Sequence, residues 1–264
     1  MSAADATARA DPTPIEGIIF DLDGTLIDYE GASHIALERP LERRGKALPW
    51  ALHATIVGTK PEDWSRNILA AVGLSGEVSP TTYAAEYFEE VDGLYASIPA
   101  WAGTLGLLRQ LRKAGFPLAI ATSSPRASFE KKMVYHAAIL ATMSAVVTGD
   151  EVEHGKPAPD IFLEAARRLG CDPTRCVVFE DAPAGITAAH AAGCAAVALP
   201  DSRMPENAPR FDALRPRWRL DEGIGAFDVA QITHVAPTRR GSAPPPPPPQ
   251  AAGSSEEPSA KRQK

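Results

Sequence analysis

The stretch Gly17-Ile18-Ile19-Phe20-Asp21-Leu22-Asp23-Gly24-Thr25 joins a short apolar run to two acids. The run contains β-branched residues and has the length of a strand, which is typical of a buried strand. In an extended segment, residues two apart point to the same side, so Asp21 and Asp23 can face one ligand. The stretch therefore predicts a strand whose carboxyl end presents two acids.

The following sequence alternates between strand-like and helix-like segments. Residues 161–169 form an amphipathic helical pattern, with Asp160 as its expected N-cap and Gly170 at its end. Helical patterns are also expected near residues 105–111 and 184–192, and further strands at residues 116–121, 145–147, 176–179 and 195–199. Short apolar strands separated by helices predict an α/β fold with a parallel sheet that is covered on both faces.

Polar side chains follow four of these strands, at the edge where such sheets bind ligands. They are an acid pair, a run of hydroxyls, a lysine and a second acid pair: Asp21 and Asp23, Thr122-Ser123-Ser124, Lys156, and Glu180-Asp181. One polar residue after a strand is more often part of a turn or a helix cap. The ordered set of four indicates a functional site.

These residue types support phosphoryl transfer. Two carboxylates held close together have pKa values that are pushed apart, so one can act as nucleophile while the other donates or accepts a proton. Carboxylates without His or Cys suit Mg²⁺, which prefers oxygen ligands. Thr122 and nearby N–H groups can hold a phosphate oxygen, and Lys156 can balance its charge.

The composition excludes several classes of protein. The chain has 264 residues, of which 44% are hydrophobic and 23% charged, as in ordinary globular proteins. It lacks an apolar run of the ~18 residues that a membrane span needs. With 27 Lys+Arg against 33 Asp+Glu, the net charge of −6 argues against a generally basic surface for nucleic acid.

No secretory signal is recognisable at the start of the sequence, so a cytoplasmic location is expected. The three cysteines are expected to be buried and reduced: Cys171, Cys176 and Cys194.

The four motifs match, in order, those of the haloacid dehalogenase-like (HAD) hydrolase superfamily, and the resemblance extends over about residues 15–203. The stretches GDEVEHGKPAPDIF, VFEDAPAGITAA and ALPDSRM resemble a subgroup that contains pseudouridine-5′-phosphatase and plant glycerol-3-phosphatase. The resemblance implies a Rossmann-like core, a helical cap inserted after the first motif, and Mg²⁺-dependent hydrolysis of a small phosphometabolite.

The resemblance also implies roles for individual residues. Asp21 would be the nucleophile that forms an aspartyl-phosphate, and Asp23 would protonate the leaving alcohol and then activate water. Lys156 would stabilise the nucleophile and the phosphate. The phosphate would be held by Thr122 and the Ser123 amide. Mg²⁺ would be held by Asp21, the backbone carbonyl of Asp23, Asp181 and, directly or through water, Glu180.

The expected domains follow from the same resemblance. The core would comprise residues 15–30 and 98–235, and the cap residues 31–97. Lys60 in the cap either reaches the substrate or is a solvated surface lysine. Related β-phosphoglucomutases tend to carry an Arg where Pro61 stands, which makes a mutase the weaker alternative. A scaffold that kept the fold without catalysis is a second alternative, although none of the expected catalytic residues is missing.

The remaining segments are expected to be structural or solvated. Residues 1–14 and 236–264 are expected to be disordered. The tail contains a polyproline run, Pro244 to Pro249, that could be read by a proline-binding module. Residues 203–219 are basic but contain acids and prolines, which predicts a solvated segment. A monomer is expected. Asp28 is expected to cap a helix, His154 to lie in a loop, and the other histidines to be structural: His34, His53, His136, His190 and His234.

Overall fold

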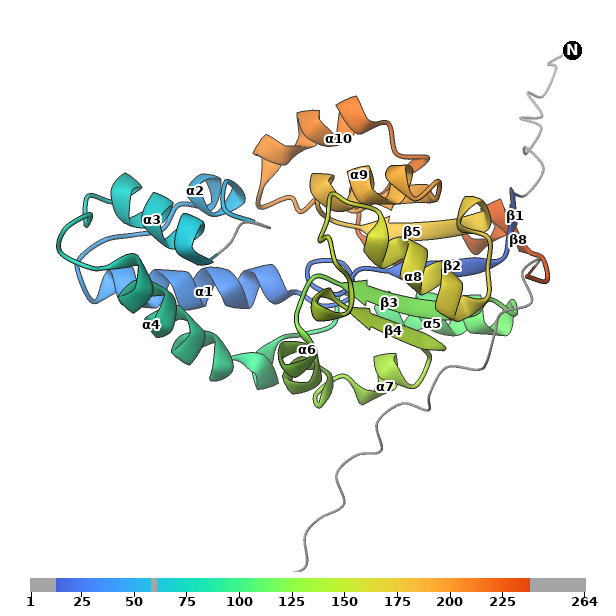
Figure 1. Cartoon of the computed structure of the whole chain (residues 1–264), viewed down its shortest axis with the longest axis horizontal. Helices are drawn as coiled ribbons and strands as arrows, with labels where there is room; N and C mark the ends of the chain where they lie inside the picture. The colour runs from blue at the N-terminus through green and yellow to red at the C-terminus, as the bar shows by residue number, and fades with distance from the viewer. Residues whose placement is uncertain (1–12, 58–60, 238–264) are drawn as a thin grey trace, which may run out of the picture.

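A computed structural model describes residues 13–57 and 61–237 of the chain. Its centre is a six-stranded parallel sheet in the order β4-β3-β2-β5-β6-β7 (Figure 1). The strands are β2 (Gly17–Phe20), β3 (Leu118–Thr122), β4 (Ala145–Thr148), β5 (Cys176–Glu180), β6 (Ala195–Ala198) and β7 (Trp218–Arg219). The predicted α/β fold with a parallel sheet is confirmed, and β2 has the predicted bounds.

The strand order places β2 at the centre of the sheet. The chain runs outward from β2 to β3 and β4, and then returns to β5 on the other side of β2. This reversal is a topological switch point, where doubly wound sheets form a crevice at the carboxyl ends of their strands. The acids that follow β2 therefore lie between the residues that follow β3 and those that follow β5.

Both faces of the sheet are covered because alternate residues along each strand point to opposite sides. Ile18 and Phe20 belong to one apolar cluster and Ile19 to the other, and all three are fully buried. Helices α8 (Asp160–Leu169), α9 (Pro183–Ala191) and α10 (Ala208–Leu214) pack in the second cluster, and α5 (Thr104–Lys113) in the first. Two further helices, α6 (Arg126–Met133) and α7 (Ala137–Leu140), connect β3 to β4.

The predicted start of α8 is wrong by one position. The helix begins at Asp160 itself and is preceded by Pro159, whose fixed φ suits a helix start. Asp160 instead accepts hydrogen bonds from the exposed His154. The predicted end is confirmed, since Gly170 has a left-handed backbone with φ of 72°.

Four helices follow β2 and lie to the left of the sheet in Figure 1. They are α1 (Tyr29–Glu42), α2 (Trp50–Ala54), α3 (Pro61–Ala71) and α4 (Pro80–Asp92). Helix α4 packs against α1 and α3, and Trp64 of α3 meets Tyr83 and Tyr87 of α4 edge to face. Asp28 caps α1 as predicted, by accepting a hydrogen bond from the Gly31 N–H at 3.0 Å. The boundaries of a separate cap domain stay a prediction.

Two segments that were predicted to be disordered or solvated contain helices or strands. Strand β1 (Thr13–Ile15) pairs with β8 (Ile232–His234), so the predicted leader extends two residues too far. The basic segment 203–219 is not merely solvated, because it contains α10 and the edge strand β7. Phe211 of α10 is fully buried in the second apolar cluster. This apolar residue ties the segment to the core, although the segment as a whole is charged. The polyproline run lies outside the described residues.

All three cysteines are free and buried, as predicted. In the described ranges, the helices are too short and too polar to cross a bilayer.

Candidate active site

The parallel sheet brings the predicted polar residues to one edge. Asp21 follows β2, Thr122 ends β3, Glu180 ends β5, and the loop after β4 carries Lys156. These positions lie on three adjacent strands and one loop, although they span more than half of the chain. They meet where parallel sheets bind their ligands, beyond the carboxyl ends of the strands, which makes this edge the candidate site.

Lys156 joins the two acid pairs. Its Nζ donates to Asp21 Oδ1 at 2.5 Å, to Glu180 Oε1 at 2.6 Å and to the Ala121 carbonyl oxygen at 3.3 Å. The side chains of Lys156, Asp21 and Glu180 are 8%, 9% and 1% exposed. A cation that is buried in this way is held in place by charge-assisted hydrogen bonds.

Electrostatics within this cluster favour a further positive charge. Burial raises the pKa of Asp21 to about 7, and repulsion from Glu180 and Asp23 adds to that rise although Lys156 opposes it. Burial alone would lower the pKa of Lys156, but Asp21 and Glu180 raise it above its ordinary value. Lys156 therefore remains an ammonium, whereas the acids around it are not fully neutralised.

Asp181 packs against the turn that follows β2. Its Oδ1 accepts a hydrogen bond from Thr25 Oγ1 at 2.9 Å. Burial and the nearby charges of Glu180, Asp21 and Glu30 raise its pKa well above the ordinary value. Gly24 is required here, because its φ is 85° and a Cβ atom would lie 2.1 Å from Asp181 Oδ2.

Glu180 is placed to hold Lys156. Its Oε1 accepts from Lys156, and its Oε2 accepts from the Ala182 N–H at 2.9 Å. Gly185 leaves room for this carboxylate, since a Cβ atom there would overlap Glu180 Oε1. Glu180 therefore holds Lys156 in place, and its predicted role as a metal ligand, directly or through water, stays a prediction.

Asp23 is bound by a residue that the sequence did not reveal. Lys132 of α6 donates to both carboxylate oxygens, at 2.7 and 2.6 Å, and Ser124 Oγ donates to Oδ2 at 2.8 Å. The Lys132 side chain is 2% exposed. No sequence signal identified it, because Lys131 and Lys132 together look like an ordinary solvated pair at the end of a helix.

The predicted phosphate-binding residues lie beside this cluster. Thr122 is buried and its Oγ1 accepts from the Ser124 N–H at 3.1 Å, while Ser123 is exposed. The turn is closed by the Gly149 N–H, which donates to the Ser124 carbonyl oxygen. Lys60, the third predicted substrate contact, lies outside the described residues.

The helices after β2 add a polar network that includes two histidines predicted to be structural, His34 and His53. His53 Nε2 lies 2.8 Å from Glu30 Oε2, and His53 Nδ1 lies 3.1 Å from His34 Nδ1. Glu30 is buried, and its charge contributes to the raised pKa of Asp181. Its place at the start of α1 therefore brings an acid from the helical insertion near the acids of the sheet.

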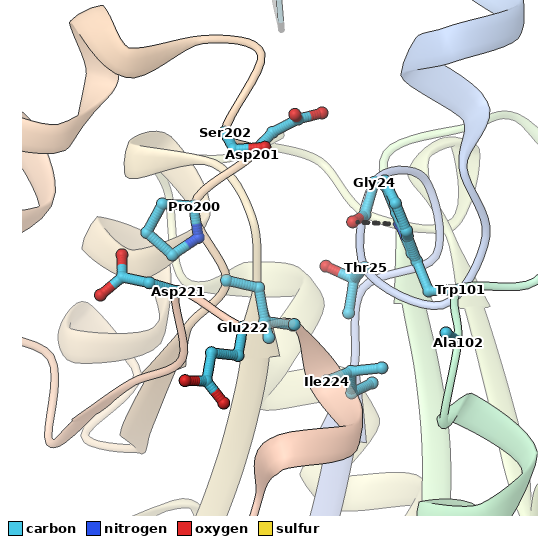
Figure 2. Close-up of a pocket in the computed structure, with 12 residues that line it drawn as sticks. Gly24, Thr25, Trp101, Ala102, Pro200, Asp201, Ser202, Asp221, Glu222 and Ile224 are labelled. Atoms are coloured by element: carbon cyan, nitrogen blue, oxygen red, sulfur yellow. Dashed lines mark hydrogen bonds between the residues drawn. The ribbon is translucent and has the colours of Figure 1, made fainter.

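A separate hollow of about 300 Å³ lies on the other side of the turn (Figure 2). Gly24 and Thr25 form part of its wall, opposite Asp221 and Glu222. The Trp101 indole N–H donates to the Gly24 carbonyl oxygen at 2.8 Å and so fixes this turn. Asp21, Asp23 and Lys156 do not line the hollow, so it is distinct from the cluster of charged groups.

The donor set fits Mg²⁺. Asp21 and Asp181 are carboxylates with raised pKa values that a cation would oppose. In the described ranges, no group of three or more His, Cys, Asp and Glu side chains is arranged to hold a metal ion. A cation here would thus rely partly on backbone oxygen and water, which agrees with the preference of Mg²⁺ for keeping several waters.

The model of the haloacid dehalogenase-like hydrolase family matches residues 15–193. The chain belongs to this family. It is 36% identical over 198 residues to (DL)-glycerol-3-phosphatase 1, mitochondrial, of Arabidopsis thaliana. That alignment covers 73% of this chain and 66% of the relative, so the chain spans just under two thirds of the relative's length. It is 36% identical over 193 residues to a probable pseudouridine-5′-phosphatase of Drosophila melanogaster, covering 71% of the chain and 83% of the relative.

Solved structures of the family have the same fold. A crystal structure of a HAD family hydrolase from Deinococcus radiodurans R1, with bound phosphate and sodium, is 27% identical, with a TM-score of 0.67. The alignment covers 79% of this chain and 91% of that one. The predicted resemblance to the family is thereby confirmed, and relatives within it are named as phosphatases.

Proposed function

We propose that the protein hydrolyses the phosphomonoester of a small metabolite, in a Mg²⁺-dependent reaction that passes through an aspartyl-phosphate on Asp21. The observation that carries this proposal is the buried Asp21 carboxylate, paired with Lys156 and flanked by Asp23 at the switch point of the sheet. Two of its relatives are named as phosphatases of glycerol 3-phosphate and, as a probable activity, pseudouridine 5′-phosphate, which supports phosphorylated alcohols of that size as substrates.

In the first step, a carboxylate oxygen of Asp21 attacks the phosphorus atom. The new bond joins that oxygen to phosphorus, and the bond between phosphorus and the leaving oxygen breaks. Asp23 gives a proton to the leaving oxygen, so that the product departs as an alcohol. Lys156 holds Asp21 in position and offsets the charge that accumulates on the transferred group.

In the second step, water attacks the phosphorus of the aspartyl-phosphate. Asp23 takes a proton from that water, the acyl phosphate bond breaks, and Asp21 is released as a carboxylate together with inorganic phosphate. Asp23 thus regains the proton that it gave in the first step. Thr122 and the Ser123 amide would hold the phosphate oxygens throughout.

The metal would be held by Asp21, Asp181 and the backbone carbonyl of Asp23. When bound, Mg²⁺ would supply a positive charge that stabilises the negatively charged phosphoryl group. Lys60 would add a contact from the helical insertion if it reaches the substrate. We place the enzyme in the cytoplasm as a monomer, and expect neither nucleic acid nor a membrane as its partner.

The two alternatives differ in what they require. A phosphosugar mutase must bind a second phosphate, and Pro61 stands where the mutases tend to carry an Arg. A non-catalytic scaffold has no use for the full set of Asp21, Asp23, Lys156 and Asp181. The hydrolase is therefore the function that the site supports best.

Phosphate release from a panel of phosphometabolites tests the proposal. The panel includes glycerol 3-phosphate, pseudouridine 5′-phosphate and β-glucose 1-phosphate, each with Mg²⁺ and with excess EDTA. We expect Mg²⁺-dependent phosphate release that is lost in Asp21→Asn. Conversion of β-glucose 1-phosphate to glucose 6-phosphate without phosphate release would favour the mutase, and no reaction with any compound would favour the scaffold.

A further inference from the structure

Lys132 is a buried lysine whose donors are all used within the protein. Its Nζ lies 2.7 and 2.6 Å from the two oxygens of Asp23 and 2.9 Å from Ser124 Oγ. An ammonium has three N–H donors, so these three acceptors account for all of them. Lys132 is therefore placed to act on Asp23 and has no donor left for a substrate.

Tyr29, the first residue of α1, completes the surroundings of this ammonium. The Lys132 Nζ lies 3.8 Å from the centre of the Tyr29 ring, a cation–π contact. The Tyr29 hydroxyl lies 2.9 Å from the Tyr87 hydroxyl of α4. The Tyr87 hydroxyl in turn lies 3.2 Å from Ser33 Oγ. A chain of contacts thus runs from Asp23 in the core, through Lys132, to the helices inserted after β2.

We propose that Lys132 is a positioning residue for Asp23, and that the Tyr29 ring holds its ammonium in place from the helical insertion. The inference rests on the proposed function, in which Asp23 transfers a proton to and from the reacting oxygens. Lys132 and Ser124 together contact both oxygens of Asp23, which fixes the plane of the carboxyl group. Proton transfer requires that a carboxyl oxygen stays within hydrogen-bond reach of the leaving oxygen.

This role has a consequence that depends on the leaving group. An alkoxide is a poor leaving group and needs the proton from Asp23, whereas p-nitrophenolate leaves readily without one. The ratio kcat/KM reports the steps up to the departure of the leaving group. Loss of the correct Asp23 geometry should therefore lower kcat/KM for an alkyl phosphate far more than for p-nitrophenyl phosphate.

The test compares Lys132→Met with Lys131→Met. Lys131 is the adjacent residue on α6, but it is exposed and pairs with the exposed Asp92. For Lys132→Met we expect kcat/KM on glycerol 3-phosphate and on pseudouridine 5′-phosphate to fall about 100-fold, the scale of general acid catalysis. For p-nitrophenyl phosphate we expect a loss below about fivefold, and Lys131→Met should match the wild type on every substrate.

Three further variants keep the inference testable if Lys132→Met does not fold. Lys132→Arg retains the charge but alters its geometry, and should fall between the wild type and Lys132→Met. Ser124→Ala removes one donor to Asp23 and should show a weaker loss with the same dependence on the leaving group. Tyr29→Leu, which removes the ring, should move in the same direction as Ser124→Ala.

The outcomes separate this inference from the proposed function. Equal losses on alkyl and p-nitrophenyl phosphates would overturn the positioning role and indicate a structural one, as would wild-type kinetics in all the Lys132 and Ser124 variants. If the wild-type protein released no phosphate from any alkyl phosphate, the proposed function would be overturned first, and the inference with it.

Discussion

Asp21 and Asp23 lie two residues apart at the end of one strand, and each is bound by a buried lysine from a distant segment. The lysine at Asp21 is Lys156, which also binds Glu180. The lysine at Asp23 is Lys132, which also contacts Ser124 and the Tyr29 ring. The two pairs look alike in isolation, but their wider surroundings give them different charges.

Around Asp21, the acids outnumber the cations. Asp21 and Glu180 share the ammonium of Lys156, Asp181 adds a further acid nearby, and burial together with repulsion from neighbouring acids raises the pKa values of Asp21 and Asp181. Around Asp23, one carboxylate faces one ammonium. The acids around Asp21 therefore carry an excess of negative charge that a bound cation would offset, whereas the charges of Asp23 and Lys132 balance each other within the protein.

The largest expected effect is at Asp21. Asp21→Asn should lower kcat by at least about 1,000-fold, because the amide is a poor nucleophile and an acceleration of many orders of magnitude depends on the covalent step. Phosphate release under saturating Mg²⁺ measures this, with Asp63→Asn on the exposed surface of α3 as the control. A variant that keeps more than a few per cent of wild-type activity would remove Asp21 from the mechanism.

Removal of Lys156 should reveal the excess of acids. Lys156→Met leaves two buried carboxylates without their partner, and breaking a buried ion pair costs about 3–5 kcal/mol. For a chain of this size we expect the melting temperature to fall by about 10 °C. The double variant with Glu180→Gln should regain part of the loss, because it removes one of the two unpaired charges. An unchanged melting temperature in the single variant would contradict this view of the cluster.

Asp181 should link stability to pH and to Mg²⁺. The pKa of Asp181 is higher in the folded protein than its ordinary value of 3.8. Well below pH 3.8 the carboxyl group is protonated in both the folded and the unfolded states and does not affect stability. As the pH rises from there to the raised pKa, the folded state is progressively destabilised. In EDTA, the wild type should thus lose stability as pH rises from about 4, whereas Asp181→Asn lacks this cost and should melt higher at pH 8. Added Mg²⁺ should raise the melting temperature of the wild type only. Thermal melts at pH 4.5 and pH 8 measure both effects, and a Mg²⁺ response in the variant would count against Asp181 as a ligand.

The smallest expected effect concerns a segment outside both pairs. The Val235 N–H donates to the Ile15 carbonyl oxygen at 2.8 Å, which ties the chain to the core near the end of the described residues. Removal of residues 238–264 should leave kcat and KM within about twofold of the full chain, because this segment has too few apolar residues to form part of a core. A larger change in either constant would assign the proline-rich tail a part in catalysis.

The sequence was sufficient for those parts of the candidate site that follow from the order of the strands. Apolar runs located the central strands to within two residues, and parallel pairing then requires their carboxyl ends to meet. The positions of Asp21, Glu180 and Asp181 at one edge of the sheet could therefore be predicted from the apolar runs that precede them. Strand β7 could not be predicted in this way, because Trp218 and Arg219 are half-buried at the sheet edge and form no apolar run.

Other features were decided by the tertiary structure alone. Lys131 and Lys132 are neighbours of the same type, and only the packing of α6 turns one toward solvent and the other toward Asp23. The contact of Glu30 with His53 similarly depends on how α2 folds back against α1. The sequence by itself determined which residues follow the strands of the sheet, because strand order brings those residues together whatever their side chains contact. It could not determine which helix residues face that edge, since burial of a charge becomes favourable only when a partner from a distant segment neutralises it.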